Sequence, residues 1–181
     1  MVYWAMNKNS PHSRPAIICV SGLKNSGKTA LIEALIPLLA KEGVRTAVIK
    51  HHGHGFAGEI PDRPGTDTYR FLAGGAYGTV IYDDETFAMV KRETASIDSL
   101  IALFPDADLI LIEGAKAGDF PRVAMLRAGQ PLTSDEATLL CAVTDKDFDA
   151  SLLPHALPRF DFGDFGPAAT LILEYIRAIN G

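Results

Sequence analysis

The sequence predicts an α/β fold with three layers, in which a mostly parallel β-sheet carries helices on both faces and one antiparallel hairpin is added. Two observations favour this class. Short apolar runs rich in β-branched residues alternate with stretches of helical spacing. The two strongest runs, 16–20 and 109–112, are apolar at every position, which is typical of strands buried on both faces.

The first part of the chain alternates between strand and helix patterns. The run 16–20 ends at Ser21-Gly22, and residues 29–42 then carry an apolar stripe at helical spacing: Leu31, Ile32, Leu35, Ile36 and Leu39. Residues 45–50 (RTAVIK) predict a second strand, followed by a long loop to Gly65. Thr66 or Asp67 can cap a short helix that ends before Gly74-Gly75.

The second part continues the alternation. Residues 78–82 (GTVIY) and 86–91 (TFAMVK) flank an acidic turn and predict the antiparallel hairpin. A helix from Ser96 to Phe104 precedes the strand at 109–112, and further strands are expected at 122–127 and 139–144. Residues 145–165 are expected to be irregular before a closing amphipathic helix at 167–179.

Composition favours one globular domain. The chain has 181 residues, 48% hydrophobic and 22% charged, and we expect a flexible N-terminal arm over 1–15 and a single domain over 16–181. A net charge of −5 argues against nucleic-acid or anionic-membrane partners. No apolar run reaches the ~18 residues of a membrane span. Cys19 and Cys141 lie inside apolar runs and are expected to be buried, and cytoplasmic localisation follows from the lack of a disulfide framework.

A phosphate-binding signature lies between the first strand and the first helix. The segment GLKNSGKT fits G-x-x-x-x-G-K-[ST] and comprises Gly22, Leu23, Lys24, Asn25, Ser26, Gly27, Lys28 and Thr29. Glycines let successive backbone N–H groups point at phosphate oxygens, and the helix N-terminus adds its dipole. Lys28 would reach the β- and γ-phosphates and Thr29 would bind Mg²⁺. The expected fold is therefore P-loop NTPase-like, with Lys24 either a second phosphate ligand or a solvated lysine.

A carboxylate is expected to complete the magnesium site. Glu113 ends the strand at 109–112 on the P-loop edge of the sheet, so it is the first choice as the Mg²⁺ partner of Thr29. Asp62 and Asp67 are alternatives that can equally serve as turn or cap residues. Asp108 lies at the opposite end of the strand.

Three histidines follow the second strand on the same sheet edge, and they are His51, His52 and His54. They can contact substrate or phosphate, bind a transition metal, or belong to an exposed loop. Arg63 and Arg70 are further cations near this loop.

Four segments together resemble one family: GLKNSGKT at 22–29, VIKHHGHGF at 48–56, PGTDTYRFLAGGA at 64–76 and DLILIEGAK at 108–116. Over roughly residues 16–145, the chain resembles the molybdopterin-guanine dinucleotide biosynthesis protein B family. One departure is Ala115, where the family prefers an aromatic residue. Residues 117–127 also match less well.

The resemblance implies a homodimeric P-loop protein that binds GTP and hydrolyses it slowly at most. It implies assistance to the guanylyltransferase that joins GMP to molybdopterin, by delivering GTP or by holding the cofactor intermediate. His51, His52, His54, Asp67 and Arg70 match the motif that faces the site in the family. Glu113, Gly114 and Lys116 match a third motif.

Guanine recognition and function leave alternatives open. Asp145 or Asp147, after the strand at 139–144, can accept from guanine N1 and N2 or serve as turn acids. A metal-insertion GTPase using the histidine loop and a small-molecule kinase are the alternative enzymes. A pure interaction module with a vestigial P-loop is the third.

Overall fold

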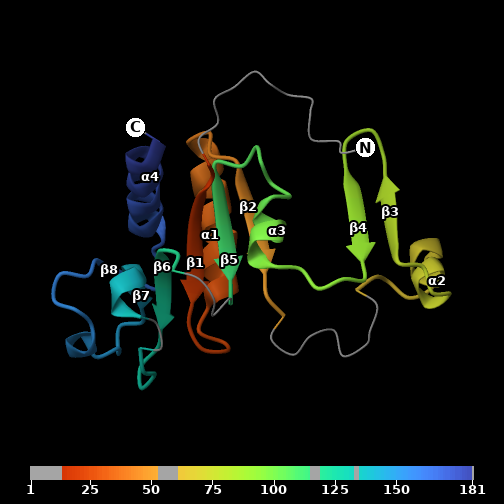
Figure 1. The fold of residues 1–181 in the computed structure, drawn as a ribbon. Coiled ribbons are helices and arrows are strands. Elements are labelled where there is room, and N and C mark those ends of the chain that lie inside the picture. The colour runs from red at the N-terminus through yellow and green to blue at the C-terminus, as the bar shows by residue number, and fades with distance from the viewer. Residues whose placement is uncertain (1–13, 53–60, 115–118, 133–134, 181) are drawn as a thin grey trace. The chain divides into compact units, whose positions relative to one another are not determined.

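The structure is a computed structural model that describes residues 14–52, 61–114, 119–132 and 135–180 (Figure 1). The chain divides into two compact units. Residues 1–51 and 100–181 form the first unit, and residues 52–99 form the second. His54, Lys116 and most of the expected N-terminal arm lie outside the described residues.

A six-stranded sheet forms the centre of the first unit, and every neighbouring pair of strands is parallel. The strand order is β2-β5-β1-β6-β7-β8. The strands are β1 (Ala16–Ser21), β2 (Thr46–Lys50), β5 (Leu109–Glu113), β6 (Arg122–Leu126), β7 (Leu139–Thr144) and β8 (Arg159–Asp161). This sheet, with its surrounding helices and the separate hairpin, confirms the predicted fold class.

Strand β8 lies inside the segment predicted to be irregular, so that prediction was wrong for residues 159–161. Three residues are too few to show the period-two pattern of a strand. The strand exists because its flanks bond to β7: Ala142 N–H donates to the Pro158 carbonyl at 2.9 Å, and Phe162 N–H donates to the Thr144 carbonyl at 2.7 Å.

Two helices cover one face of this sheet. Helix α1 (Lys28–Lys41) runs as one helix through Pro37, and α4 (Gly166–Asn180) contacts it (Figure 1). Their apolar stripes pack on alternate residues of the central strands, which share one face of the sheet. The buried helix residues are Leu31, Ile32, Leu35, Leu39, Ala168, Ala169, Ile172 and Ile176.

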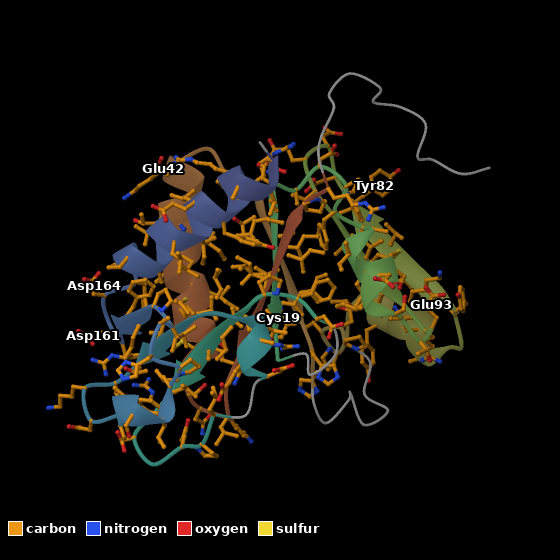
Figure 2. The ribbon with its side chains drawn as sticks, turned by 60° about the vertical axis from the view of Figure 1, so that its left-hand side comes forward. Cys19, Glu42, Tyr82, Glu93, Asp161 and Asp164 are labelled. Carbon is orange, nitrogen blue, oxygen red and sulfur yellow. The ribbon has the colours of Figure 1, made fainter. Side chains whose placement is uncertain are left out.

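A smaller cluster covers the other alternate residues of β6 and β7. Phe148 packs there with half-buried leucines from the connecting segments. These segments include two 3-10 helices, η1 (Glu136–Thr138) and η2 (Ala150–Leu152). Both cysteines are buried as predicted, and Cys19 lies in the interior of the first unit (Figure 2). Burial raises the pKa of the Cys141 thiol to about 12.

The second unit contains helix α2 (Asp67–Ala73) and the hairpin of β3 (Gly78–Tyr82) and β4 (Phe87–Lys91). The hairpin is antiparallel, as predicted, and its register runs from Gly78 opposite Lys91 to Tyr82 opposite Phe87. Among the described helices, none is long and apolar enough to cross a membrane.

Helix α3 (Ile97–Ile101) is shorter than the sequence predicts, because Leu103 and Phe104 form turns rather than helix. Pro105 disfavours helical geometry at Phe104, the residue before it.

Candidate functional site

The loop between β1 and α1 has the backbone geometry of an anion cradle. Three of its residues have positive φ: Gly22 at 142°, Asn25 at 63° and Gly27 at 101°. Gly27 is the N-cap of α1, and no side chain caps this helix end. The N–H groups of the first turn therefore have no side-chain acceptor, and a bound anion can take that place.

Both glycines of the signature are required by close packing. A Cβ on Gly22 would lie 2.4 Å from the Met125 carbonyl oxygen and 2.6 Å from Ser26 Oγ. A Cβ on Gly27 would lie 2.5 Å from Phe162 Cε2. The spacing of the signature thus reflects two different contacts, one with β6 and one with the segment after β8.

The lysine of the signature folds over its own loop. Lys28 Nζ donates to the carbonyls of Gly22 at 3.0 Å and Leu23 at 2.7 Å. Its ammonium is therefore held at the loop, beside the uncapped helix end. Lys24 is exposed and makes no side-chain hydrogen bond or ion pair within the described part of the chain.

Glu113 meets Thr29 at the end of the sheet. Glu113 is the last residue of β5, and it is only 8% exposed. Thr29 Oγ1 donates to Glu113 Oε1 at 3.1 Å, although the two residues are 84 positions apart. Neighbouring oxygen ligands of an octahedral Mg²⁺ are about 2.9 Å apart, since each bond is about 2.0–2.1 Å. The two oxygens therefore fit the expected magnesium ligands in chemistry and in spacing.

Lys50 also belongs to this group, although no role was predicted for it from the sequence. It ends β2 and is paired in register with Glu113 on β5. Its ammonium lies 3.2 Å from Glu113 Oε2 and 3.5 Å from Thr29 Oγ1. The position of Lys50 at the end of a strand could have indicated this contact. That prediction requires knowing that β2 and β5 are neighbours in the sheet.

Three other candidate residues flank β2 or β5 in the sequence. His51 donates its backbone N–H to the Glu113 carbonyl at 2.9 Å, and its side chain is exposed. His52 begins the second unit and is also exposed. Asp108 lies at the opposite end of β5, as expected, and its carboxylate binds the N–H and guanidinium of Arg45.

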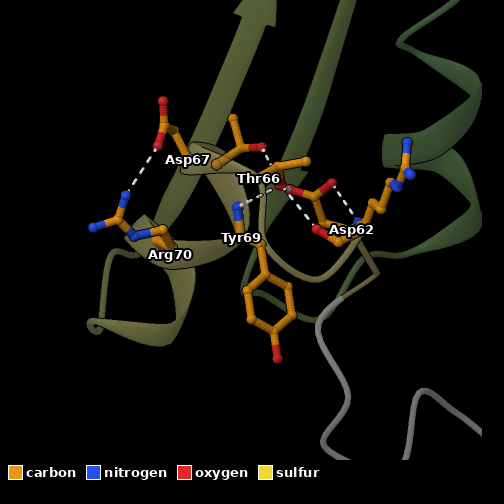
Figure 3. A network of polar contacts seen from close by, with 7 residues as sticks. Asp62, Thr66, Asp67, Tyr69 and Arg70 are labelled. Atoms are coloured by element: carbon orange, nitrogen blue, oxygen red, sulfur yellow. Dashed lines mark hydrogen bonds and ion pairs between the residues drawn. The ribbon is translucent and has the colours of Figure 1, made fainter.

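Asp62 and Asp67 belong to a local network in the second unit (Figure 3). Thr66 caps α2 by accepting from Tyr69 N–H at 3.2 Å. Asp62 accepts from Arg63 N–H at 2.6 Å, and hydrogen bonds from Thr68 and from this N–H lower its pKa. Asp67 pairs with Arg70 at 3.3 Å, and both side chains are largely exposed. Each of these acids thus has a local partner.

At the other side of the P-loop, the loops after β6 and β7 are joined. Both carboxylate oxygens of Asp145 accept from Ala128 N–H at 3.1 Å. Asp147 is exposed and has no side-chain partner within the described residues. Of the two predicted base-reading acids, Asp147 is therefore the one with a free carboxylate.

Arg127 and Phe162 lie against the P-loop, and neither was predicted from the sequence. Arg127 Nε donates to the Ser26 carbonyl at 2.9 Å, and its guanidinium stacks 3.5 Å above the Phe162 ring. No local pattern signals this contact, because it joins segments that are far apart in the chain.

Among the described residues, no group of three His, Cys, Asp or Glu side chains is placed to hold a metal ion. His54 and Lys116 lie outside the described residues.

A family model, several relatives and several solved structures point to the same family. Residues 17–146 match the family model MobB, described as molybdopterin guanine dinucleotide synthesis protein B. A "probable molybdopterin-guanine dinucleotide biosynthesis adapter protein" of Bacillus subtilis is 31% identical over 82% of this chain and 86% of its own. The adapter protein of Escherichia coli is 28% identical over 91% and 95%. The crystal structure of Bacillus subtilis MobB has a TM-score of 0.69 at 28% identity, covering 88% of this chain and 96% of that one.

Proposed function

The chain belongs to the family of molybdopterin guanine dinucleotide synthesis protein B, and on this premise we propose that it is a GTP-binding accessory protein of molybdenum cofactor maturation. The names of its relatives support the role in cofactor maturation. We further propose that it assists the guanylyltransferase that joins GMP to molybdopterin. The observation that carries the proposal is the uncapped P-loop with the Thr29–Glu113 contact beside it.

Each part of the loop has a defined task in triphosphate binding. The N–H groups at the start of α1 would bind phosphate oxygens, and Lys28 would exchange its two loop carbonyls for the β- and γ-phosphates. Thr29 and Glu113 would hold Mg²⁺, which neutralises phosphate charge. The ammonium of Lys28 would thus replace hydrogen bonds to neutral carbonyls with stronger ones to charged phosphates, which favours binding of the triphosphate.

Slow hydrolysis is consistent with the local chemistry. Phosphoryl transfer to water needs a residue that orients the attacking water. Glu113 is the carboxylate that contacts Thr29, and it is proposed to hold Mg²⁺, which leaves it unavailable to orient a water. We therefore propose that a partner protein supplies the missing group when turnover is needed.

Guanine selectivity is assigned to Asp147. Guanine presents N–H donors at N1 and N2, which one carboxylate can accept together. Asp145 already accepts from Ala128, whereas Asp147 is exposed at the same end of the sheet. The histidine motif with Asp67, Arg70 and Lys116 is proposed to face the nucleotide or the pterin intermediate.

Titration calorimetry with GTP, ATP and a non-hydrolysable GTP analogue, each with Mg²⁺, tests this proposal. We expect tight GTP binding and weak ATP binding. Lys28→Ala should abolish GTP binding and leave the thermal melt nearly unchanged, because the lysine contacts only loop carbonyls. Lys41→Ala, at the far end of α1, is the matched control and should bind normally.

The other outcomes point to other functions. Unchanged affinity in a folded Lys28→Ala variant would contradict the P-loop assignment. A preference for ATP would favour a kinase or a metal-handling ATPase. If no nucleotide binds or alters melting, the chain is an interaction module with a vestigial loop.

A further inference from the structure

An amino group lies beside both side chains of the proposed magnesium site. Lys50 Nζ is 3.2 Å from Glu113 Oε2 and 3.5 Å from Thr29 Oγ1. These two side chains are also the proposed metal ligands. A single cation therefore touches both groups in the nucleotide-free protein.

The register of the sheet brings Lys50 and Glu113 together. Parallel pairing of β2 with β5 sets Lys50 directly opposite Glu113, and residues paired in this way project from the same face. The residue before, Ile49, is buried and holds the end of β2 in place. The pairing of the two strands therefore places Lys50 beside the carboxylate of Glu113.

The carboxylate needs a cation in this position. The Glu113 side chain is only 10% exposed, and a buried carboxylate without a partner is strongly unfavourable. The Lys50 side chain is 56% exposed, so it can move into solvent without unpacking the core. One partner is fixed and the other is free to leave.

We propose that Lys50 is the resident counter-ion of Glu113 and competes with Mg²⁺ for Glu113 and Thr29. The inference rests on the magnesium site of the proposed function. Two cations cannot share this position, because like charges a few ångströms apart repel. Mg²⁺ displaces the ammonium only when a triphosphate adds further oxygen ligands and negative charge. Lys50 thereby makes metal binding dependent on nucleotide binding.

Lys50→Met tests the competition, because methionine keeps an unbranched side chain of nearly the same length and removes the charge. The Mg²⁺ concentration that gives half of the maximal GTP affinity should fall by about fivefold to tenfold, since a competing charge is removed. The matched control is Lys41→Met, which removes an exposed lysine from the end of α1 and should leave this concentration unchanged.

A second readout needs no nucleotide. In EDTA, Lys50→Met should melt at a lower temperature than the parent protein, because Glu113 loses its counter-ion. Mg²⁺ alone should then raise the melting temperature of Lys50→Met and not that of the parent. In Lys50→Met with Glu113→Gln, this effect of Mg²⁺ should disappear.

Several outcomes would overturn the inference. An unchanged Mg²⁺ midpoint in Lys50→Met would show that the lysine does not compete. A higher midpoint would mark Lys50 as a phosphate ligand, and Mg²⁺-independent GTP binding by the parent would mean that Lys50 replaces the metal. If the parent binds no GTP, the proposed function fails, and the melting comparison still decides the role of Lys50.

Discussion

At the scale of single residues, the P-loop depends on glycine for space as well as for backbone conformation. Gly22 has a positive φ of 142° and lies against the backbone of β6. Gly43, after α1, also has a positive φ, of 78°, but nothing lies within 4 Å of a Cβ built there. The pair compares a glycine that needs both its backbone conformation and its space with one that needs its conformation alone.

Gly43→Ala should lower the free energy of unfolding by about 1–2 kcal/mol, from backbone strain alone. Gly22→Ala should cost about 1–3 kcal/mol more, because its methyl group meets the Met125 carbonyl, which cannot move without shifting β6. Urea denaturation of both variants measures the difference. Equal losses would contradict the close contact.

At the scale of elements, the turn between β3 and β4 is organised by one carboxylate. Asp83 Oδ1 accepts from the N–H groups of Glu85 at 2.9 Å and Thr86 at 2.7 Å, and from the Thr86 hydroxyl at 3.2 Å. These hydrogen bonds lower the pKa of Asp83. A group whose pKa is lowered in the folded state stabilises that state above its unfolded pKa, and loses this effect as the pH falls.

Asp83→Ala should therefore speed amide hydrogen exchange in β3 and β4 at neutral pH, because the turn loses its acceptor. The difference from the parent should begin to shrink as the pH falls below about 4, the ordinary pKa of Asp, and should vanish only below the lowered pKa that Asp83 has in the folded state. Asp84→Ala is the control, since Asp84 has no side-chain partner within the described residues. Equal exchange in all three proteins would show that the strands alone fix the turn.

The order of the strands explains why the candidate binding residues gather at the P-loop edge of the sheet. β1 lies between β5 and β6, so the loop that follows it is flanked by the ends of two parallel strands. One neighbour supplies Glu113 and the other leads to Arg127. In parallel sheets the carboxyl ends of adjacent strands meet at one edge, which concentrates these side chains.

At the scale of the whole molecule, we predict a homodimer through the apolar face that the second unit exposes. Four large side chains project from the same face of the hairpin, where paired residues lie together. They are Val80, Tyr82, Phe87 and Met89, and Tyr82 is 80% exposed (Figure 2). A two-stranded sheet is marginally stable alone and has unpaired edges. A second copy of the hairpin would cover both.

Val80→Lys should convert a dimer to monomers, because the charge would have to be buried in the interface. Sedimentation velocity measures the mass of the parent and the variant. Leu152→Lys is the control, because Leu152 is exposed to almost the same extent, 53% against 55%, but lies on η2. A parent protein that sediments as a monomer would contradict the proposal, and loss of the dimer in both variants would exclude a role specific to the hairpin.

The local features of this protein can be predicted from its sequence. The P-loop signature, the alternation of buried strands with helices and the hairpin are all encoded within short segments. The Thr66 cap and the ends of β7 were also readable, because caps and continuous apolar runs depend on neighbouring residues only.

Contacts between residues that are distant in the chain depend on the three-dimensional fold. The pairing of Lys50 with Glu113, the bond of Asp145 to Ala128 and the stacking of Arg127 on Phe162 depend on the order of the strands. Strand β8 likewise exists through its pairing with β7. The central strands pack together against α1 and α4, and no short segment carries the order in which they pair.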